Sequence, residues 1–306
     1  MQILGYACIN TALSKNGVSV NRGMIRRTFD AKGLPLCGEL AEKNLIDLLS
    51  IITWNYNNGV SNYRMSSDMF PWMSEYELAD LPNFHYTIQP ILEAIGDSVL
   101  ELKQKVSFHP GQFDCLASPN PDIVRKTIFD LEQHNRIMDL MRLPANPLFN
   151  INIHVGGVYG DKAATLDRFA QNFALLSENL RNRLTVENDD TKNGYRVEDL
   201  MYLHQRIGVP IVFDTLHWQC NPGELSYQSA FELAHTTWRD VIPEIHHSSS
   251  KRTHEDPTSP IKAHADFLYE RAETFGTTVY VTIESKAKEQ ALLRYKEEFV
   301  MEEVLV

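Results

Sequence analysis

Short apolar runs alternate along this chain with longer segments in which apolar residues recur at every third or fourth position. The segment AEKNLIDLLSIITWNY has this longer spacing at Leu45, Leu48, Leu49, Ile52 and Tyr56, which predicts one buried face of a helix. Similar helical segments lie near residues 87–104, 121–142, 162–181, 196–207, 227–236, 264–275 and 286–300. The short apolar runs predict strands near residues 2–8, 61–66, 105–109, 149–154, 183–187, 210–214, 241–247 and 278–284.

These elements form eight strand–helix units with no linker or low-complexity stretch between them. Such a repeat is typical of the (β/α)8 barrel, or TIM barrel, and a chain of 306 residues has a suitable length. We therefore expect one α/β domain that covers residues 1–306. The competing fold is an open doubly wound sheet, which would require a glycine-rich phosphate turn, and GxGxxG does not occur.

The composition gives no sign of export or membrane insertion. No apolar run reaches 18 residues, and the start MQILGYACIN lacks a basic leader. We therefore expect a cytoplasmic protein with no membrane partner. The cysteines Cys8, Cys37, Cys115 and Cys220 form no CxxC pair and are expected to be free thiols.

Six successive predicted strands end in a residue that can bind a metal ion. The third strand ends in VSFH, the fourth in NINIH, the fifth in LTVE, the sixth in IVFD, the seventh in PEIH and the eighth in VTIE. Strand side chains alternate, so Ile153, Val186, Phe213, Ile245 and Ile283 face the helices while these end residues face the barrel axis. Because TIM-barrel active sites form at the carboxyl ends of the strands, all of these end residues converge on one mouth.

Several carboxylates close together in a barrel mouth that excludes water would repel one another, and bound divalent cations would neutralise their charge. His217, three residues past the sixth strand, and His264, beyond the seventh, are further candidates. The full set of candidate metal ligands is His109, His154, Glu187, Asp214, His217, Glu244, His246, His264 and Glu284. Nine ligands are too many for one ion, so two or three divalent ions are expected, with Glu187 as a bridge. Nitrogen and oxygen donors fit Mn, which we favour, and also Zn, Fe or Mg.

Clustered divalent ions suit phosphoryl displacement, in which one ion activates water while others hold the phosphate and stabilise the leaving oxygen. The carboxylates of Glu187, Asp214, Glu244 and Glu284 are the expected catalytic groups. The sequence contains no GxSxG, P-loop or HExxH motif, so we expect no nucleotide cofactor and no serine-hydrolase chemistry.

The motifs GYACIN, HPGQF, HVGGVYGDK, VENDD, DTLHW, NPGEL and ESKAKEQ occur in this order through most of the chain. In this order they resemble the UV damage endonucleases, a family similar to the endonuclease IV group of abasic-site nucleases. The resemblance implies a metal-dependent TIM barrel that incises damaged double-stranded DNA immediately 5′ of UV photoproducts, leaving a 3′-hydroxyl and a 5′-phosphate. Abasic sites and other distorting lesions are further expected substrates. We also expect a monomer that works at the nucleoid.

The resemblance also assigns roles to single residues. It implies one ion at His109, His154 and Glu187, a second at Glu187, Asp214, His246 and Glu284, and a third at His217 and His264. It implies that Tyr6 and Asn10 contact the lesion. It further implies that Gln112 enters the duplex where damaged nucleotides leave, a step that costs less for a distorted dinucleotide than for a paired one.

Three positions depart from the pattern of the family. Relatives can carry a histidine where this chain has Glu75, which puts that contact in doubt. Relatives often carry a tyrosine where this chain has Phe113, which keeps the stacking face and loses the hydroxyl. Relatives can carry a lysine two residues before His246, where this chain has Glu244, expected to be a direct carboxylate ligand.

Two other functions are compatible with parts of the pattern. A metal-dependent sugar isomerase or epimerase uses the same barrel and similar strand-end ligands, and fold alone cannot separate it from a nuclease. A non-catalytic damage-binding module would not need nine converging ligands. The net charge of −11 argues against an extended nucleic-acid surface, although Arg22, Arg26, Arg27 and Lys32 form a local basic cluster that would hold phosphates.

Overall fold

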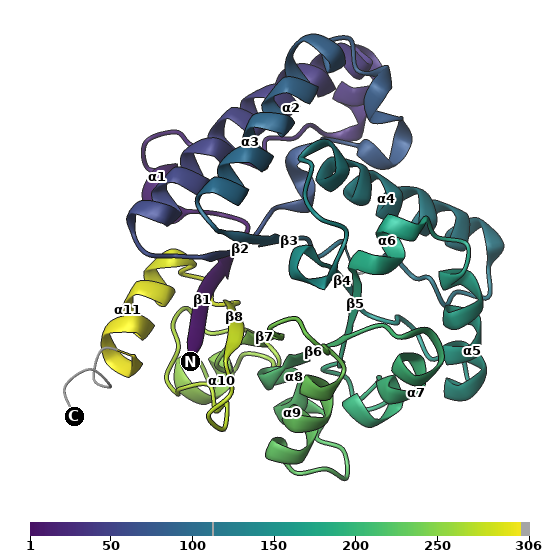
Figure 1. Ribbon diagram of the computed structural model, residues 1–306, viewed down its shortest axis with the longest axis vertical. Helices are drawn as coiled ribbons and strands as arrows, with labels where there is room; N and C mark the ends of the chain where they lie inside the picture. The colour runs from purple at the N-terminus through teal and green to yellow at the C-terminus, as the bar shows by residue number, and fades with distance from the viewer. Residues whose placement is uncertain (112, 301–306) are drawn as a thin grey trace.

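Eight parallel strands form one sheet at the centre of the computed structural model, which describes residues 1–111 and 113–300. The order of the strands is β3-β2-β1-β8-β7-β6-β5-β4, and helices surround them (Figure 1). The strands are β1 Gln2–Ala7, β2 Asn62–Arg64, β3 Lys105–Ser107, β4 Ile151–Ile153, β5 Leu184–Glu187, β6 Ile211–Asp214, β7 Glu244–His247 and β8 Val279–Ile283. All eight lie where the apolar runs predict them, and each is shorter than its predicted range.

The two edge strands of this sheet meet and close it into a barrel. Phe108, one residue past β3, forms a parallel bridge with Ile151 of β4. The backbone N–H of Phe108 donates to the carbonyl of Asn150 at 3.0 Å, and the N–H of Asn152 donates to the carbonyl of Phe108 at 2.9 Å. The predicted (β/α)8 TIM barrel is therefore confirmed.

The outer layer consists of helices that follow most of the strands. They are α1 Thr11–Ser14, α2 Arg26–Asn57, α3 Gln89–Glu101, α4 Pro121–Leu140, α5 Lys162–Phe173, α6 Glu178–Arg183, α7 Val197–Ile207, α8 Thr215–Cys220, α9 Tyr227–Thr236, α10 Lys251–His254 and α11 Glu289–Phe299. Short 3₁₀ or π turns lie at Ser67–Met69, Met73–Glu75, Leu78–Asp80, Phe84–Ile88 and Pro147–Phe149. None of the described helices is long and apolar enough to cross a membrane.

The helix predicted near residues 264–275 is wrong, because this stretch is an irregular loop between β7 and β8. Its backbone N–H groups have partners outside the stretch. The carboxylate of Glu255 accepts from the N–H of Asp266 at 2.7 Å and from that of Phe267 at 3.3 Å. The N–H of Tyr269 donates to the hydroxyl of Ser249 at 3.0 Å. These tertiary hydrogen bonds replace the helical pattern that the apolar spacing favours.

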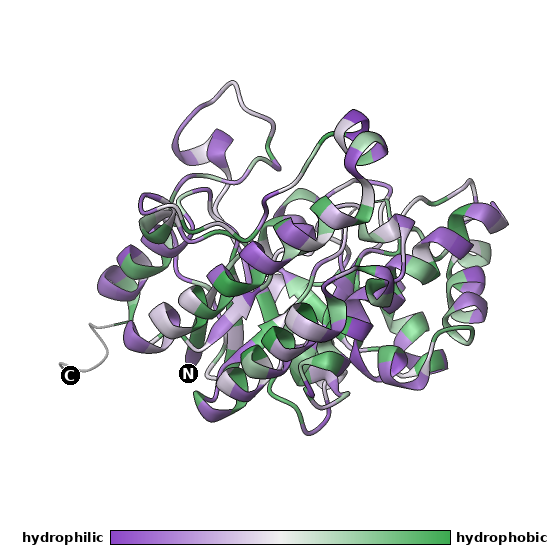
Figure 2. Cartoon of the chain, turned by 90° about the horizontal axis from the view of Figure 1, so that it is seen from above, coloured by the Kyte–Doolittle hydropathy of each residue, from purple (hydrophilic) through white to green (hydrophobic). Residues whose placement is uncertain are grey.

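The barrel has an apolar outside and a polar inside. Ile151, Ile153 and Val186 are buried between the strands and the helices, and Figure 2 shows hydrophobic strands at the centre with hydrophilic stretches on the outer helices. The residues that alternate with them are polar and equally buried, and they include Asn62, Lys105, Asn150, Asn152, Thr185, Glu244 and Thr282. Each of these polar groups needs a partner inside the barrel, because burial without a hydrogen bond is costly.

The contact between α3 and α4 gives a test of this packing. A Cβ added at Gly96 of α3 would lie 1.7 Å from the carbonyl oxygen of Met141 at the end of α4. Gly96→Ala is therefore expected to lower the free energy of unfolding by about 1–3 kcal/mol, as overpacking of a tight contact does. Urea denaturation measures the loss. The matched control is Gly23→Ala, whose added Cβ meets no described atom within 4 Å; equal midpoints for the two variants would contradict the packing.

Candidate metal centre

Most of the predicted ligands lie at the carboxyl ends of the strands, on one rim of the barrel. Glu187 and Asp214 are the last residues of β5 and β6, His246 belongs to β7, and Glu284 directly follows β8. His109 lies two residues past β3, and His154 directly follows β4. His217 belongs to the short helix α8, which starts immediately after Asp214. Parallel strands bring all of these ends to the same rim, as the alternation predicts.

Three groups of these side chains can each hold a metal ion. The groups are His109–His154–Glu187, Glu187–Asp214–His217 and Asp214–His246–Glu284, and within each group the ligand atoms lie within 4.8 Å of one another. Glu187 belongs to two groups and Asp214 to two, so the three groups adjoin. The bridging role of Glu187 stays a prediction.

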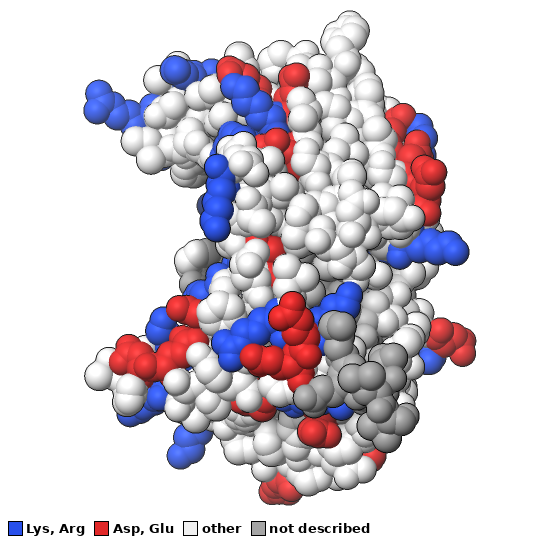
Figure 3. Space-filling model, turned by 90° about the vertical axis from the view of Figure 1, so that its left-hand side faces the viewer, with Lys and Arg blue, Asp and Glu red and all other residues white. Residues whose placement is uncertain are grey.

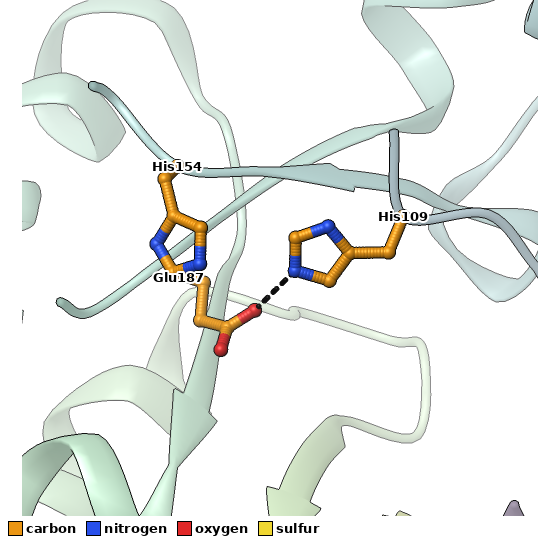
Figure 4. Close-up of side chains that lie close together, drawn as sticks. All are labelled: His109, His154 and Glu187. Carbon is orange, nitrogen blue, oxygen red and sulfur yellow. Dashed lines mark hydrogen bonds and ion pairs between the residues drawn. The ribbon is translucent and has the colours of Figure 1, made fainter. Parts of the chain in front are cut away.

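The first group lies at the seam of the barrel, where the edge strands β3 and β4 meet. His109 follows β3 and His154 follows β4, and both point toward Glu187 (Figure 4). Nε2 of His109 lies 3.1 Å from Oε2 of Glu187, and the rings of His109 and His154 are 5.4 Å apart. Nδ1 of His154 lies 2.8 Å from Oδ1 of Asp189, a residue that the sequence analysis did not select. The carboxylate of Asp189 thus lies beside Nδ1 of His154 and leaves its Nε2 available as a ligand.

Asp214 presents an oxygen that lacks a protein partner. Its Oδ1 accepts from the N–H of His217 at 2.7 Å and so caps the start of α8. Its Oδ2 is buried and accepts no hydrogen bond from any described residue. A buried carboxylate oxygen without a donor is unfavourable, and a cation would satisfy it. The donor set of imidazoles and carboxylates therefore fits a divalent ion at this position.

The charges of the cluster depend on one another. Burial would raise the pKa of Glu187, but the imidazoles of His246 and His154 hold the pKa of that carboxyl well below its usual range. Burial would lower the pKa of His246, but the carboxylates of Glu187 and Glu284 raise it to about 9. Burial dominates at Asp214 and raises the pKa of its carboxyl against the opposing effect of His217. Imidazolium groups thus balance the carboxylates, as bound cations would.

His264 lies at the edge of the cluster. Its Nδ1 lies 2.7 Å from the backbone oxygen of Glu284 and 3.7 Å from the carboxylate oxygen Oε2 of the same residue. None of the three groups includes it. The backbone contact at Nδ1 leaves Nε2 of His264 available to a ligand.

Glu244 does not reach the rim, contrary to the expectation of a direct ligand. Its Oε2 lies 2.9 Å from Nζ of Lys105, and its Oε1 accepts from the hydroxyl of Thr282 at 2.6 Å. Burial would raise the pKa of Glu244, but Lys105 lowers it to about 2. Glu244 lies two residues before His246, so it faces the same interior about 6.6 Å deeper along the strand.

Arg64 is a charged residue of the cluster that the sequence analysis missed. It ends β2, its side chain is largely buried, and its Nη1 donates to Oε1 of Glu284. Burial would lower the pKa of the guanidinium, but Glu284 and Glu187 raise it. Arginine does not bind metal ions, so a pattern of metal-binding residues does not point to Arg64, although a charged residue at the end of β2 repeats the pattern of the other strands.

Tyr6 and Asn10 are buried, so their expected contact with a lesion is not supported by this arrangement. Tyr6 alternates with Gly5 on β1 and faces the helices, where its hydroxyl donates to Asn55 of α2 at 2.8 Å. The amide of Asn10 donates to the same hydroxyl at 2.9 Å. Asn10 also caps α1 by accepting from the N–H of Leu13. Both side chains therefore hold the loop after β1 against α2.

Phe113 is strongly exposed, with 83% of its surface accessible. It lies on the loop that follows His109, and its contact with DNA stays a prediction. Gln112, the other expected probe, lies outside the described residues. Glu75, the departure from the family histidine, lies 3.3 Å from the guanidinium of Arg26 and belongs to none of the three ligand groups.

The local basic cluster is partly neutralised. Arg22 pairs with Asp47 at 2.7 Å, and Arg26 pairs with Asp30 at 2.8 Å. Arg27 and Lys32 are exposed and form no ion pair with a described residue. Figure 3 shows a hollow on one side of the molecule, between two projecting parts that both carry Lys and Arg side chains. Positive charge is therefore available locally despite the acidic total.

The fold and the rim define a TIM barrel with a candidate polynuclear metal centre. Its fold is shared by the structure of an L-ribulose 3-epimerase, which superposes with a TM-score of 0.52 at 13% identity and covers 78% of this chain and 76% of the epimerase chain. A likeness at this identity shows the common barrel alone.

The profile of the UV-endonuclease UvdE family matches residues 2–305, and the chain belongs to this family. The chain is 33% identical over 309 residues to a UV-damage endonuclease of Schizosaccharomyces pombe, with 94% of this chain and 49% of the relative covered. It thus spans about half the length of that relative. A putative UV-damage endonuclease of Acanthamoeba polyphaga mimivirus is 28% identical over 95% of this chain and 89% of its own. The crystal structure of SacUVDE superposes with a TM-score of 0.83 at 28% identity, covering 97% and 99% of the two chains.

Asp114, the residue after Phe113, forms a pair of carboxyl groups with Asp130, and this pair predicts a dependence of stability on pH. Asp114 shares a hydrogen bond with Asp130 of α4, and Nδ1 of His134 lies 3.3 Å from Asp130. Burial, together with Asp130, raises the pKa of Asp114 from 3.8 to about 8. The folded state therefore favours the protonated carboxyl. Its contribution to stability is complete below about pH 4 and is lost as the pH rises through about 8.

Asp114→Asn imitates the protonated carboxyl at every pH. At pH 8 it is expected to raise the melting temperature by at least about 2 °C, the shift that roughly 1 kcal/mol gives in a chain of this size. The gain should shrink toward zero at about pH 4. Thermal unfolding over this pH range measures it. Asp122→Asn at the exposed start of α4 is the control, and a pH-independent effect of Asp114→Asn would contradict the shared proton.

Proposed function

We propose that this chain is a metal-dependent DNA endonuclease that incises the strand immediately 5′ of UV photoproducts and leaves a 3′-hydroxyl and a 5′-phosphate. The observation that carries the proposal is the set of three adjoining ligand groups that share Glu187 and Asp214 at one rim. The family supports the substrate, because the chain belongs to the UV-endonuclease UvdE family. We extend the range of lesions to abasic sites and other distortions of the duplex.

The proposed centre holds two or three divalent ions, with Mn²⁺ as the first choice and Zn²⁺, Mg²⁺ or Fe²⁺ as alternatives. When bound, such ions supply an activated water and stabilise the phosphate and the leaving oxygen. Glu187 and Asp214 are each shared by two groups, so they fix the spacing of the sites. His217 and His264 are the residues available to a further ion. We assign the catalytic role to Glu187, Asp214 and Glu284.

Positive charge from the protein complements the ions. The guanidinium of Arg64 lies against Glu284 at the rim, where it favours negative charge that develops on the phosphate. Asp189 orients His154. The protein therefore provides both the ligands and the groups that hold the ligands in one orientation.

Recognition of the lesion is assigned to the loop that follows His109. UV photoproducts weaken base pairing and stacking, so their nucleotides leave the duplex at lower cost than paired ones. Phe113 offers an exposed ring that can stack where the nucleotides leave. We propose that Gln112 acts beside it. The partner is damaged double-stranded DNA at the nucleoid, and the acting species is a monomer.

A sugar isomerase or epimerase is the alternative on the same barrel. Similarity to epimerases is limited to the fold at 13% identity, whereas the nuclease family matches along nearly the whole chain. Nicking of UV-irradiated plasmid in the presence of Mn²⁺ decides between the two, with unirradiated plasmid as the reference.

The shared carboxylates give the first test. Asp214→Asn and Glu187→Gln are each expected to reduce incision of UV-irradiated DNA by more than about 100-fold, since loss of a residue that only orients a metal ligand already costs about 10–100-fold. Binding to the damaged duplex should be largely kept. The matched control is Asp190→Asn, because Asp190 pairs with Lys262 at 3.1 Å outside the three groups. Full activity of Asp214→Asn with chelator present would refute the metal centre.

The exposed ring gives the second test. Phe113→Ala is expected to weaken binding to a photoproduct duplex roughly 10- to 100-fold, because stacking on a base contributes about 1–3 kcal/mol. Binding to undamaged duplex should change much less, since it depends on phosphate contacts. Phe113→Tyr keeps the ring and is the matched control. Equilibrium binding at one salt concentration, in the Asp214→Asn background, measures both. Equal losses on the two duplexes would assign Phe113 to general DNA contact.

A further inference from the structure

A buried lysine lies inside the barrel, below the metal rim. Lys105 of β3 has an exposed fraction of only 1%, as does Glu244 of β7, and their Nζ and Oε2 atoms are 2.9 Å apart. The ammonium of Lys105 also donates to the side-chain oxygen of Asn150 at 3.1 Å and approaches that of Asn62 at 3.4 Å. An ammonium can only donate hydrogen bonds, so Lys105 is the start of every hydrogen-bonded chain that reaches it.

One chain of hydrogen bonds runs from Lys105 to the shared ligand Glu187. The side-chain amide of Asn150 donates to the hydroxyl of Thr185 at 3.1 Å. That hydroxyl donates to the side-chain oxygen of Asn152 at 2.9 Å. The amide of Asn152 then donates to Oε2 of Glu187. Asn150, Asn152 and Thr185 are all buried to 1% exposure or less.

The direction of this chain is fixed at both ends. Lys105 can only donate, and an ionised Glu187 can only accept. Each amide between them must therefore present its oxygen toward Lys105 and its nitrogen toward Glu187. Reversal of either asparagine would place two donors or two acceptors face to face at a buried position, which is costly.

A second chain leaves Lys105 and returns to its counter-ion. The amide of Asn62 donates to the hydroxyl of Thr282 at 2.9 Å, and that hydroxyl donates to Oε1 of Glu244 at 2.6 Å. This chain ends at Glu244 and does not contact Glu187. The two chains thus share Lys105 as donor, and each contains one buried threonine at its centre.

We propose that Lys105 is a positioning residue of the metal centre, which orients the shared carboxylate of Glu187 through the chain Asn150–Thr185–Asn152. Glu244 is the counter-charge that allows the lysine to be buried. This inference rests on the proposed metal centre and adds residues that do not contact the ions. It also explains why the barrel keeps a buried ion pair, since such a pair is often replaceable by apolar residues without loss of stability.

The two threonines give a matched experiment. Thr185→Val and Thr282→Val are isosteric changes at positions with 0% exposure, and each breaks one chain at its centre. Titration of the metal-free protein with Mn²⁺ is expected to show a 10- to 100-fold lower affinity for Thr185→Val. Loss of a hydrogen-bond partner that orients a metal ligand usually has an effect of this size. Thr282→Val should bind Mn²⁺ nearly as the parent protein does. Magnetic coupling between the bound Mn²⁺ ions, measured by electron paramagnetic resonance, should weaken in Thr185→Val only.

The outcomes separate this inference from the proposed function. Equal Mn²⁺ affinities of the two valine variants would contradict the proposal that the hydrogen-bond chain from Lys105 orients Glu187. Absence of Mn²⁺ binding by the parent protein would overturn the metal centre itself. Melting temperatures of the metal-free variants show whether both valines cost similar stability.

If Thr185→Val does not fold, the double variant Lys105→Met with Glu244→Met replaces it, because removal of both charges avoids an unpaired buried ion. Reduced Mn²⁺ affinity with a retained melting temperature would support the inference. Parental affinity in this double variant would overturn it.

Discussion

Repulsion among buried carboxylates is the constraint on which the other features of this protein depend. Glu187, Asp214 and Glu284 lie together at one rim, in surroundings that exclude water from two of them almost completely. Like charges cannot share such a site unless positive groups reach it. The barrel supplies imidazoles from several strands and the guanidinium of Arg64 from β2. Only a fold that brings many strand ends to one rim can collect these groups from distant parts of the sequence.

The alternation of strand side chains predicts which residues face the inside of the barrel, but not how far along the strand each one lies from the rim. Alternation correctly predicted that the candidate ligands at the ends of β3 to β8 lie close together, because every second residue faces the interior. The same rule made Glu244 look equivalent to His246, although two positions along a strand separate them by about 6.6 Å. The partner that holds Glu244 at that depth is Lys105, which is 139 positions earlier in the chain. An ion pair between residues this far apart in the sequence leaves no pattern among the residues next to either one.

Other differences have local causes that spacing cannot reveal. The loop at residues 264–275 has a helical pattern of apolar residues, yet Glu255 and Ser249 take up its backbone donors. Tyr6 lies on the outward face of β1, where α2 covers it. Arg64 does not belong to a metal-binding residue type, so the ligand pattern gives no sign of it, although its side chain contacts the candidate ligand Glu284. The fold was thus predictable from periodicity, whereas the supporting contacts depend on tertiary neighbours.

The seam between β3 and β4 connects the candidate metal centre with the stability of the barrel. Strands β3 and β4 join through the single bridge between Phe108 and Ile151, whereas the other neighbouring strands pair over two or more positions. His109 and His154 extend from the two sides of this seam, just above the bridge. An ion bound by both histidines would link β3 and β4, the neighbouring strands that pair over the fewest positions. A cation bound there would also stabilise the closed barrel, and its removal is expected to loosen first the contact between these two strands.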